Sequence, residues 1–225
     1  MEIYKLSDNI AVKNDGGNFG EILKITNLKQ AVKNPERVNV FVNEKYEFSL
    51  TVSQVVDLKI KVGQCITLNE LGEYKKLSEF GKLYQRTLEW ALVRPRSEKE
   101  VFDYLSKKIY EKKLDKDFIE TIIEKLKSKK YLNDEDFAGW YVENRLVKKG
   151  VSRKRLKLEL LKKGIKREIA EKILEESGRD EKDEILKIIA KKRAKYDDDK
   201  LIQYLGRQGF SYELARDLVL EHGKD

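Results

Sequence analysis

The feature that most constrains this fold is a block of helical sequence that occurs three times in the last two thirds of the chain. The middle segment of each block, at 94–109, 150–165 and 196–210, has the same apolar spacing. Its aligned apolar pairs are Val101 with Leu105, Leu156 with Leu160, and Leu201 with Leu205. Residues four apart share one face of a helix, and a short block buries such a face only by stacking on its neighbours. The sequence therefore predicts a mainly α fold, in which three tandem three-helix repeats form an elongated, curved array.

Each middle segment lies between two further helical segments. The preceding segments cover 83–93, 134–149 and 180–195, and the following segments cover 115–129, 166–176 and 211–221. Each block therefore has the amphipathic segments that a three-helix repeat needs. We predict an N-terminal region at 1–77 and a helical domain at 78–225, in which repeat one covers 78–132, repeat two 133–178 and repeat three 179–225.

The N-terminal region has the period of two that is typical of β-strands. Apolar residues alternate in 37–43 and in 46–52 on either side of a short polar turn, so a hairpin is expected. A third strand is a candidate at 21–32, and Ser53 is expected to cap a short helix. We therefore predict a small N-terminal β region, either a hairpin or a three-stranded sheet. Residues 1–20 support no specific prediction.

Positive charge is concentrated in one stretch of the chain. The net charge is +8, and residues 1–80 contribute nothing to it because their 11 basic and 11 acidic residues cancel. Residues 81–225 hold 37 basic and 29 acidic residues. Within them, the stretch 145–167, here called the basic segment, has 11 basic residues and one acid, Glu159. Its local net charge of +10 (11 minus 1) predicts a partner that is a polyanion or an acidic protein surface.

The basic segment also departs from its sister segments in the first turn of the expected helix. In the sisters, Ser97 and Asp197 are followed by acidic residues, which the positive end of the helix dipole favours. In the middle repeat, Ser152 is followed by the cations Arg153, Lys154 and Arg155, a reversal that costs roughly 0.3–1 kcal/mol per charge. One interpretation is a solvated helix with acidic partners nearby. The contrast with the sisters favours the other, in which these cations bind a partner. We expect that changing the three to Glu, Ala and Glu keeps the fold, stabilises the helix slightly and weakens binding.

The chain lacks the residues that most enzyme classes need. Its one histidine, His222, leaves no catalytic triad and no multi-histidine metal site, and no phosphate-binding loop motif is present. Acidic clusters lie at the expected helix starts, where capping explains them better than metal binding. Trp90, Trp140 and Tyr141 are expected in the core rather than stacked on bases. We therefore predict no enzymatic activity, no cofactor and no metal.

The cysteine and apolar content bear on the location of the protein. A single cysteine, Cys65, excludes an internal disulfide, and its apolar surroundings predict a packed thiol. No stretch approaches the roughly 18 apolar residues of a membrane span, and the N-terminus lacks the features of a signal peptide. The expected location is the reducing cytoplasm, without membrane attachment.

Three stretches of the sequence resemble the RecX family: RPRSEKEV at 94–101, NDEDFAGWYVENRL at 133–146 and GVSRKRLKLELLKKGI at 150–165. The repeat layout resembles that family too, and the hairpin with its following Lys-Val-Gly-Gln turn is similar to the N-terminal extension of longer members. RecX proteins are bacterial regulators of the recombinase RecA, in DNA repair, homologous recombination and the SOS response. They bind within the groove of the RecA filament on DNA, inhibit its strand-exchange, ATPase and co-protease activities, and promote its disassembly.

The resemblance, which extends over residues 21–222, implies a non-enzymatic regulator whose partners are the RecA filament and single-stranded, and also double-stranded, DNA. We expect the protein to be a monomer. The alternative is a sequence-nonspecific DNA-binding helical repeat protein without a recombinase partner. We predict that the DNA- or RecA-binding residues are the cations of the basic segment: Arg145, Lys148, Lys149, Arg153, Lys154, Arg155, Lys157, Lys162, Lys163, Lys166 and Arg167. The sequence leaves open whether they contact DNA phosphates or RecA.

Overall fold

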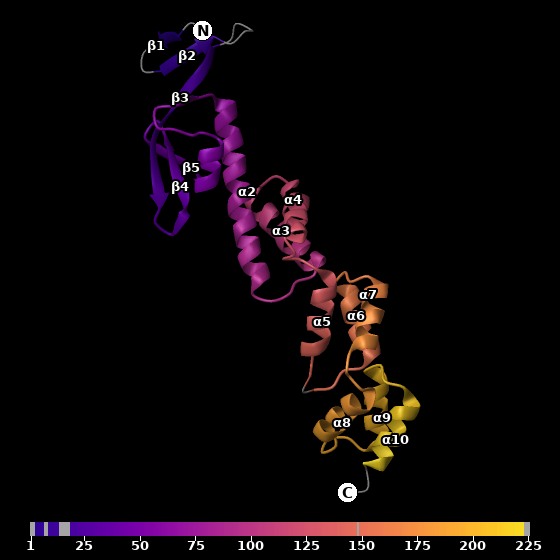
Figure 1. The fold of residues 1–225 in the computed structure, drawn as a ribbon. Coiled ribbons are helices and arrows are strands. Elements are labelled where there is room, and N and C mark those ends of the chain that lie inside the picture. The colour runs from indigo at the N-terminus through magenta and orange to yellow at the C-terminus, as the bar shows by residue number, and fades with distance from the viewer. Residues whose placement is uncertain (1–2, 7–8, 14–18, 148, 223–225) are drawn as a thin grey trace. The chain divides into compact units, whose positions relative to one another are not determined.

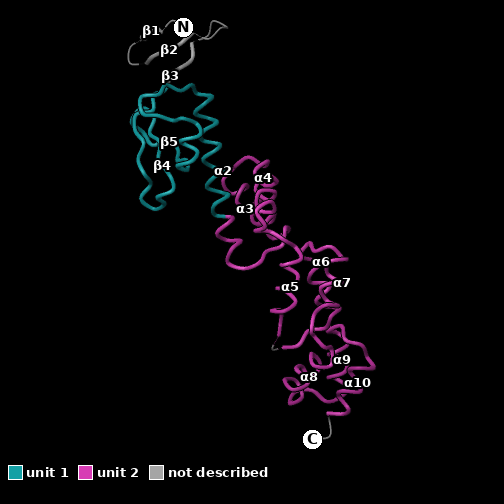
Figure 2. Tube along the Cα trace, in the orientation of Figure 1, with its two compact units in different colours: residues 1–86 teal, residues 87–225 magenta. Residues whose placement is uncertain are grey.

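The computed structural model describes every residue except 1–2, 7–8, 14–18, 148 and 223–225 (Figure 1). Its contacts divide the chain into two compact units, Met1–Arg86 and Thr87–Asp225 (Figure 2). The first unit holds a β-sheet and most of a long helix, and the second holds the helices that follow. No helix in the described residues is long and apolar enough to cross a membrane.

The sheet of the first unit is antiparallel and has the strand order β1-β2-β3-β4-β5, with β6 beside β3. Its strands are β1 Ile3–Leu6, β2 Asn9–Lys13, β3 Phe19–Ala31, β4 Asn34–Val42, β5 Lys45–Thr51 and β6 Cys65–Ile66. Strands β4 and β5 confirm the predicted hairpin, and β3 confirms the third strand. Asn43 and Glu44 join β4 to β5 with φ of 48° and 67°, the left-handed conformations that a two-residue type I′ turn requires.

The short helix after β5 is α1 (Val52–Asp57), and its N-cap is Thr51. The prediction that Ser53 caps this helix was therefore wrong. The Thr51 hydroxyl accepts a hydrogen bond from the Gln54 backbone N–H (3.2 Å), and the Gln54 side chain accepts one from the Thr51 N–H (2.9 Å). This reciprocal capping box satisfies two backbone donors, whereas Ser53 lies inside the helix.

Cys65 is exposed, not packed as expected. Strand β6 pairs with β3 so that Ile66 lies opposite Leu23 and Cys65 lies opposite Lys24. Ile66 and Leu23 are buried in the core of the first unit. Because successive residues of a strand point to opposite faces, Cys65 and Lys24 lie on the solvent side.

The long helix α2 (Leu68–Leu92) begins well before residue 78, where the helical period was expected to start. A second capping box explains the early start. The Thr67 hydroxyl accepts from the Glu70 backbone N–H (3.2 Å), and the Glu70 carboxylate accepts from the Thr67 N–H (2.7 Å). Leu71 then packs into the core beneath the sheet. The Thr-x-x-Glu pattern was a local signal for this start that the prediction overlooked.

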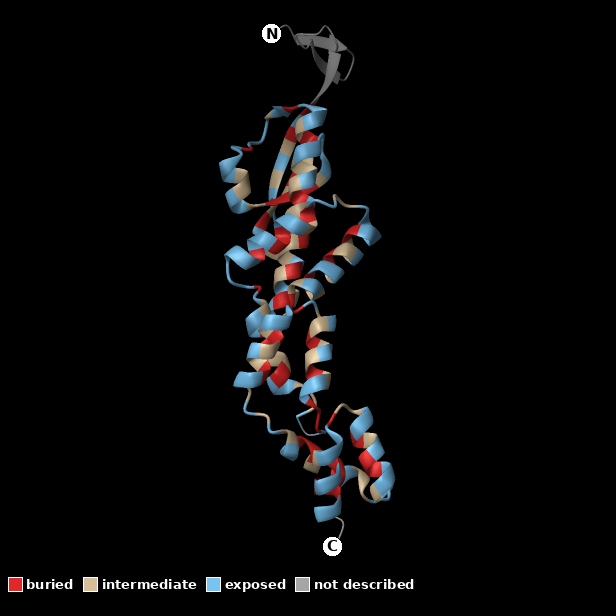
Figure 3. Ribbon diagram, turned by 90° about the vertical axis from the view of Figure 1, so that its right-hand side faces the viewer, coloured by how far each residue is buried: buried red, intermediate tan, exposed pale blue. Residues whose placement is uncertain are grey.

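The second unit confirms the predicted three-helix repeats. Repeat one contains the end of α2 with α3 (Glu98–Lys112) and α4 (Phe118–Ser128). Repeat two contains α5 (Asp134–Asn144), α6 (Arg153–Lys162) and α7 (Arg167–Glu176), and repeat three contains α8 (Glu181–Lys192), α9 (Asp198–Arg207) and α10 (Tyr212–Glu221). The six aligned apolar residues of the middle helices are at most 1% exposed. Buried positions recur along one side of each helix, so each repeat buries an apolar stripe (Figure 3).

Candidate interface on the middle repeat

The middle helix α6 begins at the N-cap residue Ser152, whose hydroxyl accepts a hydrogen bond from a backbone N–H of the first turn (3.2 Å). That turn has no acid of its own. The next repeat supplies two: Glu181 Oε1 accepts from the Arg153 N–H (3.2 Å) and Glu184 Oε2 accepts from the Val151 N–H (2.8 Å). Carboxylates of α8 therefore face the positive end of the helix dipole, which offsets the unfavourable cations there.

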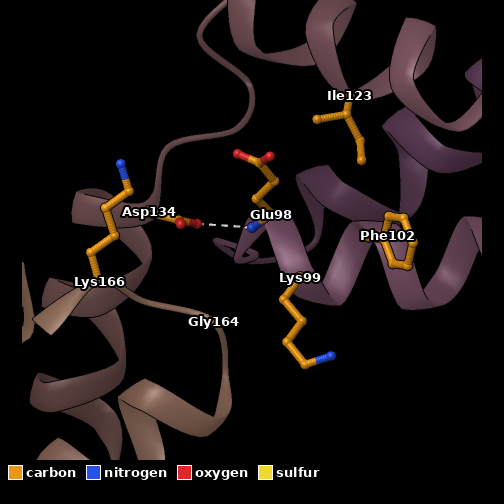
Figure 4. A pocket seen from close by; sticks show the side chains of 7 residues that line it. All are labelled: Glu98, Lys99, Phe102, Ile123, Asp134, Gly164 and Lys166. Carbon is orange, nitrogen blue, oxygen red and sulfur yellow. Dashed lines mark hydrogen bonds between the residues drawn. The ribbon is translucent and has the colours of Figure 1, made fainter.

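The same arrangement occurs between repeats one and two. Asp134, the first residue of α5, accepts a hydrogen bond from the backbone N–H of Glu98, the first residue of α3 (2.8 Å; Figure 4). Burial raises the pKa of Asp134 despite this hydrogen bond. Asp134 and Glu181 hold equivalent places in their repeats. The first acid of each following repeat thus caps the middle helix of the repeat before it.

Glu159, the one acid of the basic segment, holds three of its neighbours. Its carboxylate accepts from Arg145 Nε (2.7 Å) and Nη2 (3.1 Å), from the Tyr141 hydroxyl (2.8 Å) and from Arg155 Nε (3.1 Å). The hydrogen bonds, that from Arg145 first, outweigh burial and lower the pKa of Glu159 to about 2. Burial, and then the bond to Glu159, raise the pKa of Tyr141 to about 12. Arg145 and Arg155 are therefore fixed inside the repeat.

We expect this cluster to make stability depend on pH in acid. The pKa of Glu159 is about 2 in the folded protein and 4.5 ordinarily, so its stabilisation is complete above about pH 4.5 and is lost as the pH falls through about 2. The melting temperature of the wild type should fall more steeply across this window than that of Glu159→Gln, which has no carboxyl to protonate. Circular dichroism melts at a series of pH values would measure both slopes. Equal slopes would show that the cluster does not act in this way.

Three further cations of the basic segment have partners inside the protein: Lys163 with Glu100 of repeat one (2.6 Å), Lys157 with Glu171, and Arg153 with the Leu174 carbonyl. Five others are exposed and have no carboxylate within 4 Å among the residues that the structure describes: Lys149, Lys154, Lys162, Lys166 and Arg167. We call these five the free cations. Lys148 lies outside the described residues. The interpretation as a solvated helix with acidic partners thus fits the paired cations, and the free cations are the ones available to another molecule.

These contacts change what is expected of charge reversal in the first turn of α6. A glutamate in place of Arg155 would face Glu159 and would lose the hydrogen bond to the Gln208 side chain of repeat three. A glutamate in place of Arg153 would lie close to Glu181. Both changes are now expected to destabilise the protein, contrary to the small gain expected from the sequence. Only Lys154 is exposed and unpaired among the three.

Two arginines outside the basic segment cover tryptophans at the same junction. The guanidinium carbon of Arg96 lies 3.9 Å from the ring centroid of Trp90, and that of Arg94 lies 4.9 Å from that of Trp140. Arg94 also pairs with Glu100 (3.0 Å), the carboxylate that holds repeat two. Both tryptophans are partly buried beneath these cations, which agrees with the packing role expected for them. The sequence did not reveal the arginines as links between repeats, because only the fold brings Trp140 to Arg94.

Two glycines allow the repeats to approach closely. Gly164 and Gly209 hold equivalent positions and have φ of +85° and +96°. A Cβ on Gly164 would lie 2.7 Å from the Cβ of Lys99 in repeat one, and a Cβ on Gly209 would lie 2.9 Å from the Oγ of Ser152 in repeat two. The first junction also leaves a groove of about 340 Å³ beside Lys99 and Gly164 (Figure 4). Each repeat that follows another therefore needs a glycine at this position.

The arrangement offers charge and surface rather than catalytic groups. Among the described residues, no cluster of three or more His, Cys, Asp or Glu side chains could hold a metal ion. The acids of the middle repeat are engaged in capping and ion pairs, and the free cations lie on its surface. Such a surface is suited to binding a negatively charged macromolecule.

Comparisons with known proteins address both units. The chain matches the family model described as "Regulatory protein RecX N-terminal domain" over residues 23–67, and that described as "RecX, second three-helix domain" over residues 133–174. It is 30% identical over 207 residues to the regulatory protein RecX of Listeria monocytogenes, which covers 88% of this chain and 76% of the relative. It is 29% identical over 208 residues to that of Clostridium botulinum, with coverage of 88% and 95%.

Solved structures give the same result for the fold. A crystal structure of regulatory protein RecX has a TM-score of 0.63 at 22% identity and covers 85% of this chain and 96% of its own. The crystal structure of RecX from Lactobacillus salivarius has a TM-score of 0.51 at 29% identity, with coverage of 63% and 95%. The helical repeats thus have counterparts of known structure.

Proposed function

Because this chain belongs to the RecX regulatory protein family, we propose that it regulates the RecA recombinase without being an enzyme itself. It binds RecA filaments on DNA, inhibits their ATPase, strand-exchange and co-protease activities, and promotes their disassembly. It acts as a monomer in the cytoplasm. Family membership supports the target, and the five free cations of the middle repeat support the mode of binding.

The observation that carries the proposal is the contrast between free and paired cations. Arg145, Arg155 and Lys163 are neutralised by carboxylates and contribute little field at the surface. The free cations lie at both ends of α6 and at the start of α7, with no carboxylate within 4 Å in the described chain. Lysine and arginine in such positions neutralise phosphates and release counterions, or pair with acidic side chains. The proposed interface is therefore narrower than the whole basic segment.

The direct test is the ATPase activity of RecA on single-stranded DNA, measured with increasing amounts of the purified protein. We expect inhibition at near-equimolar protein. A protein that leaves the ATPase rate unchanged at that ratio would rule out the proposed function. General DNA binding, which the same free cations favour, is the second candidate. It would show as tight binding to bare DNA that accounts for all inhibition by occupying the DNA.

Removing two free cations should change the salt dependence of DNA binding. We expect Lys149→Gln with Lys166→Gln to reduce the slope of log K against log salt by about 2, since each lost phosphate contact removes about 0.9. The control is Lys116→Gln with Lys129→Gln, which removes the same charge from exposed sites in repeat one. Fluorescence anisotropy of labelled single-stranded DNA at several salt concentrations gives both slopes. If both double variants change the slope equally, total charge alone explains binding.

A further inference from the structure

One strip of α6 combines an exposed leucine with two free cations. Lys154, Leu158 and Lys162 follow each other at intervals of four residues, so their side chains lie on one face of the helix. Leu158 is 51% exposed, and neither lysine has a carboxylate within 4 Å in the described chain. A single exposed leucine is ordinary on a protein surface. Its position between two unpaired lysines is the feature that needs an explanation.

The sister helices show that the repeat fold does not require this leucine. The residue equivalent to Leu158 is Asp103 in α3 and Gln203 in α9, and both are exposed. In α3, Asp103 pairs with Lys99, the residue equivalent to Lys154 (3.2 Å). The middle repeat has therefore replaced a polar, charge-compensating residue by an apolar one. Within the monomer this exchange exposes apolar surface and leaves a lysine unpaired, so it gains nothing there.

The strip is also held in place by the next repeat. A Cβ on Gly209 would lie 3.5 Å from the Cβ and 3.6 Å from the Cδ of Lys154, so the lysine stem lies against the backbone of repeat three. The buried N-cap Ser152 fixes the start of the helix by a hydrogen bond from its hydroxyl to the Gln208 carbonyl (2.6 Å). A surface that is already ordered loses less conformational entropy when a partner binds.

We propose that the Lys154–Leu158–Lys162 strip docks on a protein surface that has an apolar recess bordered by carboxylates. The inference rests on the proposed function and deepens it, because it assigns this strip to the RecA protein of the filament rather than to its DNA. A leucine gains nothing from phosphates, and nonspecific nucleic-acid surfaces combine cations with aromatic rings. A helix that docks in a protein groove uses an apolar anchor, and the flanking lysines complement acidic side chains around it.

The test separates apolar docking from charge. We expect Leu158→Gln, which installs the residue of the third repeat and keeps the net charge, to weaken binding to RecA filaments on single-stranded DNA about tenfold or more. Binding to the same DNA without RecA should not change. Leu158→Asp, which installs the residue of the first repeat, should weaken filament binding further. Leu220→Gln, at a leucine of α10 that is 44% exposed, is the matched control and should bind filaments like the wild type.

Each outcome bears on one proposal. Filament binding by Leu158→Gln that equals the wild type overturns the docking surface and leaves the proposed function standing. An equal loss on filaments and on bare DNA also overturns it, because the strip would then serve nucleic acid. A wild type that shows no affinity for RecA filaments beyond its affinity for their DNA overturns the proposed function itself. Circular dichroism of each variant confirms that the helices are intact before binding is measured.

Discussion

Replacing Glu184 by alanine is expected to cost about 3–5 kcal/mol of stability in the second unit, the largest effect of any single change considered for this protein. The Glu184 carboxylate is 3% exposed and accepts hydrogen bonds from the Val151 N–H (2.8 Å), Arg179 Nη2 (2.9 Å) and Lys187 Nζ (2.7 Å). Burial raises the pKa of Glu184, but these hydrogen bonds together hold it below its usual range. Alanine would leave a backbone N–H and a largely buried guanidinium without their acceptor.

The measurement can be confined to the unit concerned. Both tryptophans of the chain, Trp90 and Trp140, lie in the second unit, so urea unfolding followed by their fluorescence reports on the repeats and not on the sheet. Asp183→Ala, at the exposed neighbouring acid of α8, is the control and should change stability little. A Glu184→Ala protein as stable as this control would show that the junction does not depend on the buried carboxylate.

Two glycines close together should respond to alanine with opposite signs. Gly209→Ala is expected to destabilise by about 2 kcal/mol or more, because an L-residue is strained at its φ of +96° and its Cβ would lie 2.9 Å from the Ser152 hydroxyl. Gly206→Ala, inside α9 with open space around the added Cβ, should stabilise by about 0.5–1 kcal/mol. Thermal melts of the two variants against the wild type decide the matter. A loss in both, or a gain in both, would contradict the role of Gly209 in repeat contact.

The repeats could be predicted because their signals are local. Leu156 and Leu160 lie on one face of α6 whatever surrounds the helix, and the same spacing in α3 and α9 is visible without knowledge of any contact. The start of α2 was equally local, in Thr67 and Glu70, but a capping box was not sought there. The exposure of Cys65 could not be predicted, because it depends on which face of β3 the short strand β6 meets.

The candidate site was predicted in position but not in detail. The basic segment is obvious from charge alone, yet half of its described cations are paired, as Lys163 is with Glu100 at a separation of 63 residues. No sequence rule identifies such a pair, since it depends on how the repeats stack. The comparison of sister helices did point to the first turn of α6, but α8 supplies the missing acids there. The exposed Leu158 was overlooked because its aligned leucine neighbours are core residues.

The junction between successive repeats also fixes the order in which they can be joined. Glu100 of repeat one and Arg155 of repeat two occupy equivalent positions, as do their partners across the junction, Lys163 and Gln208. A middle repeat stacked on a second copy of itself would place Arg155 against Lys163, two cations in contact. Chains built by duplicating the middle repeat should therefore fail to propagate. The three repeats form a directional series with one beginning and one end, so neighbouring molecules cannot extend it by exchanging parts.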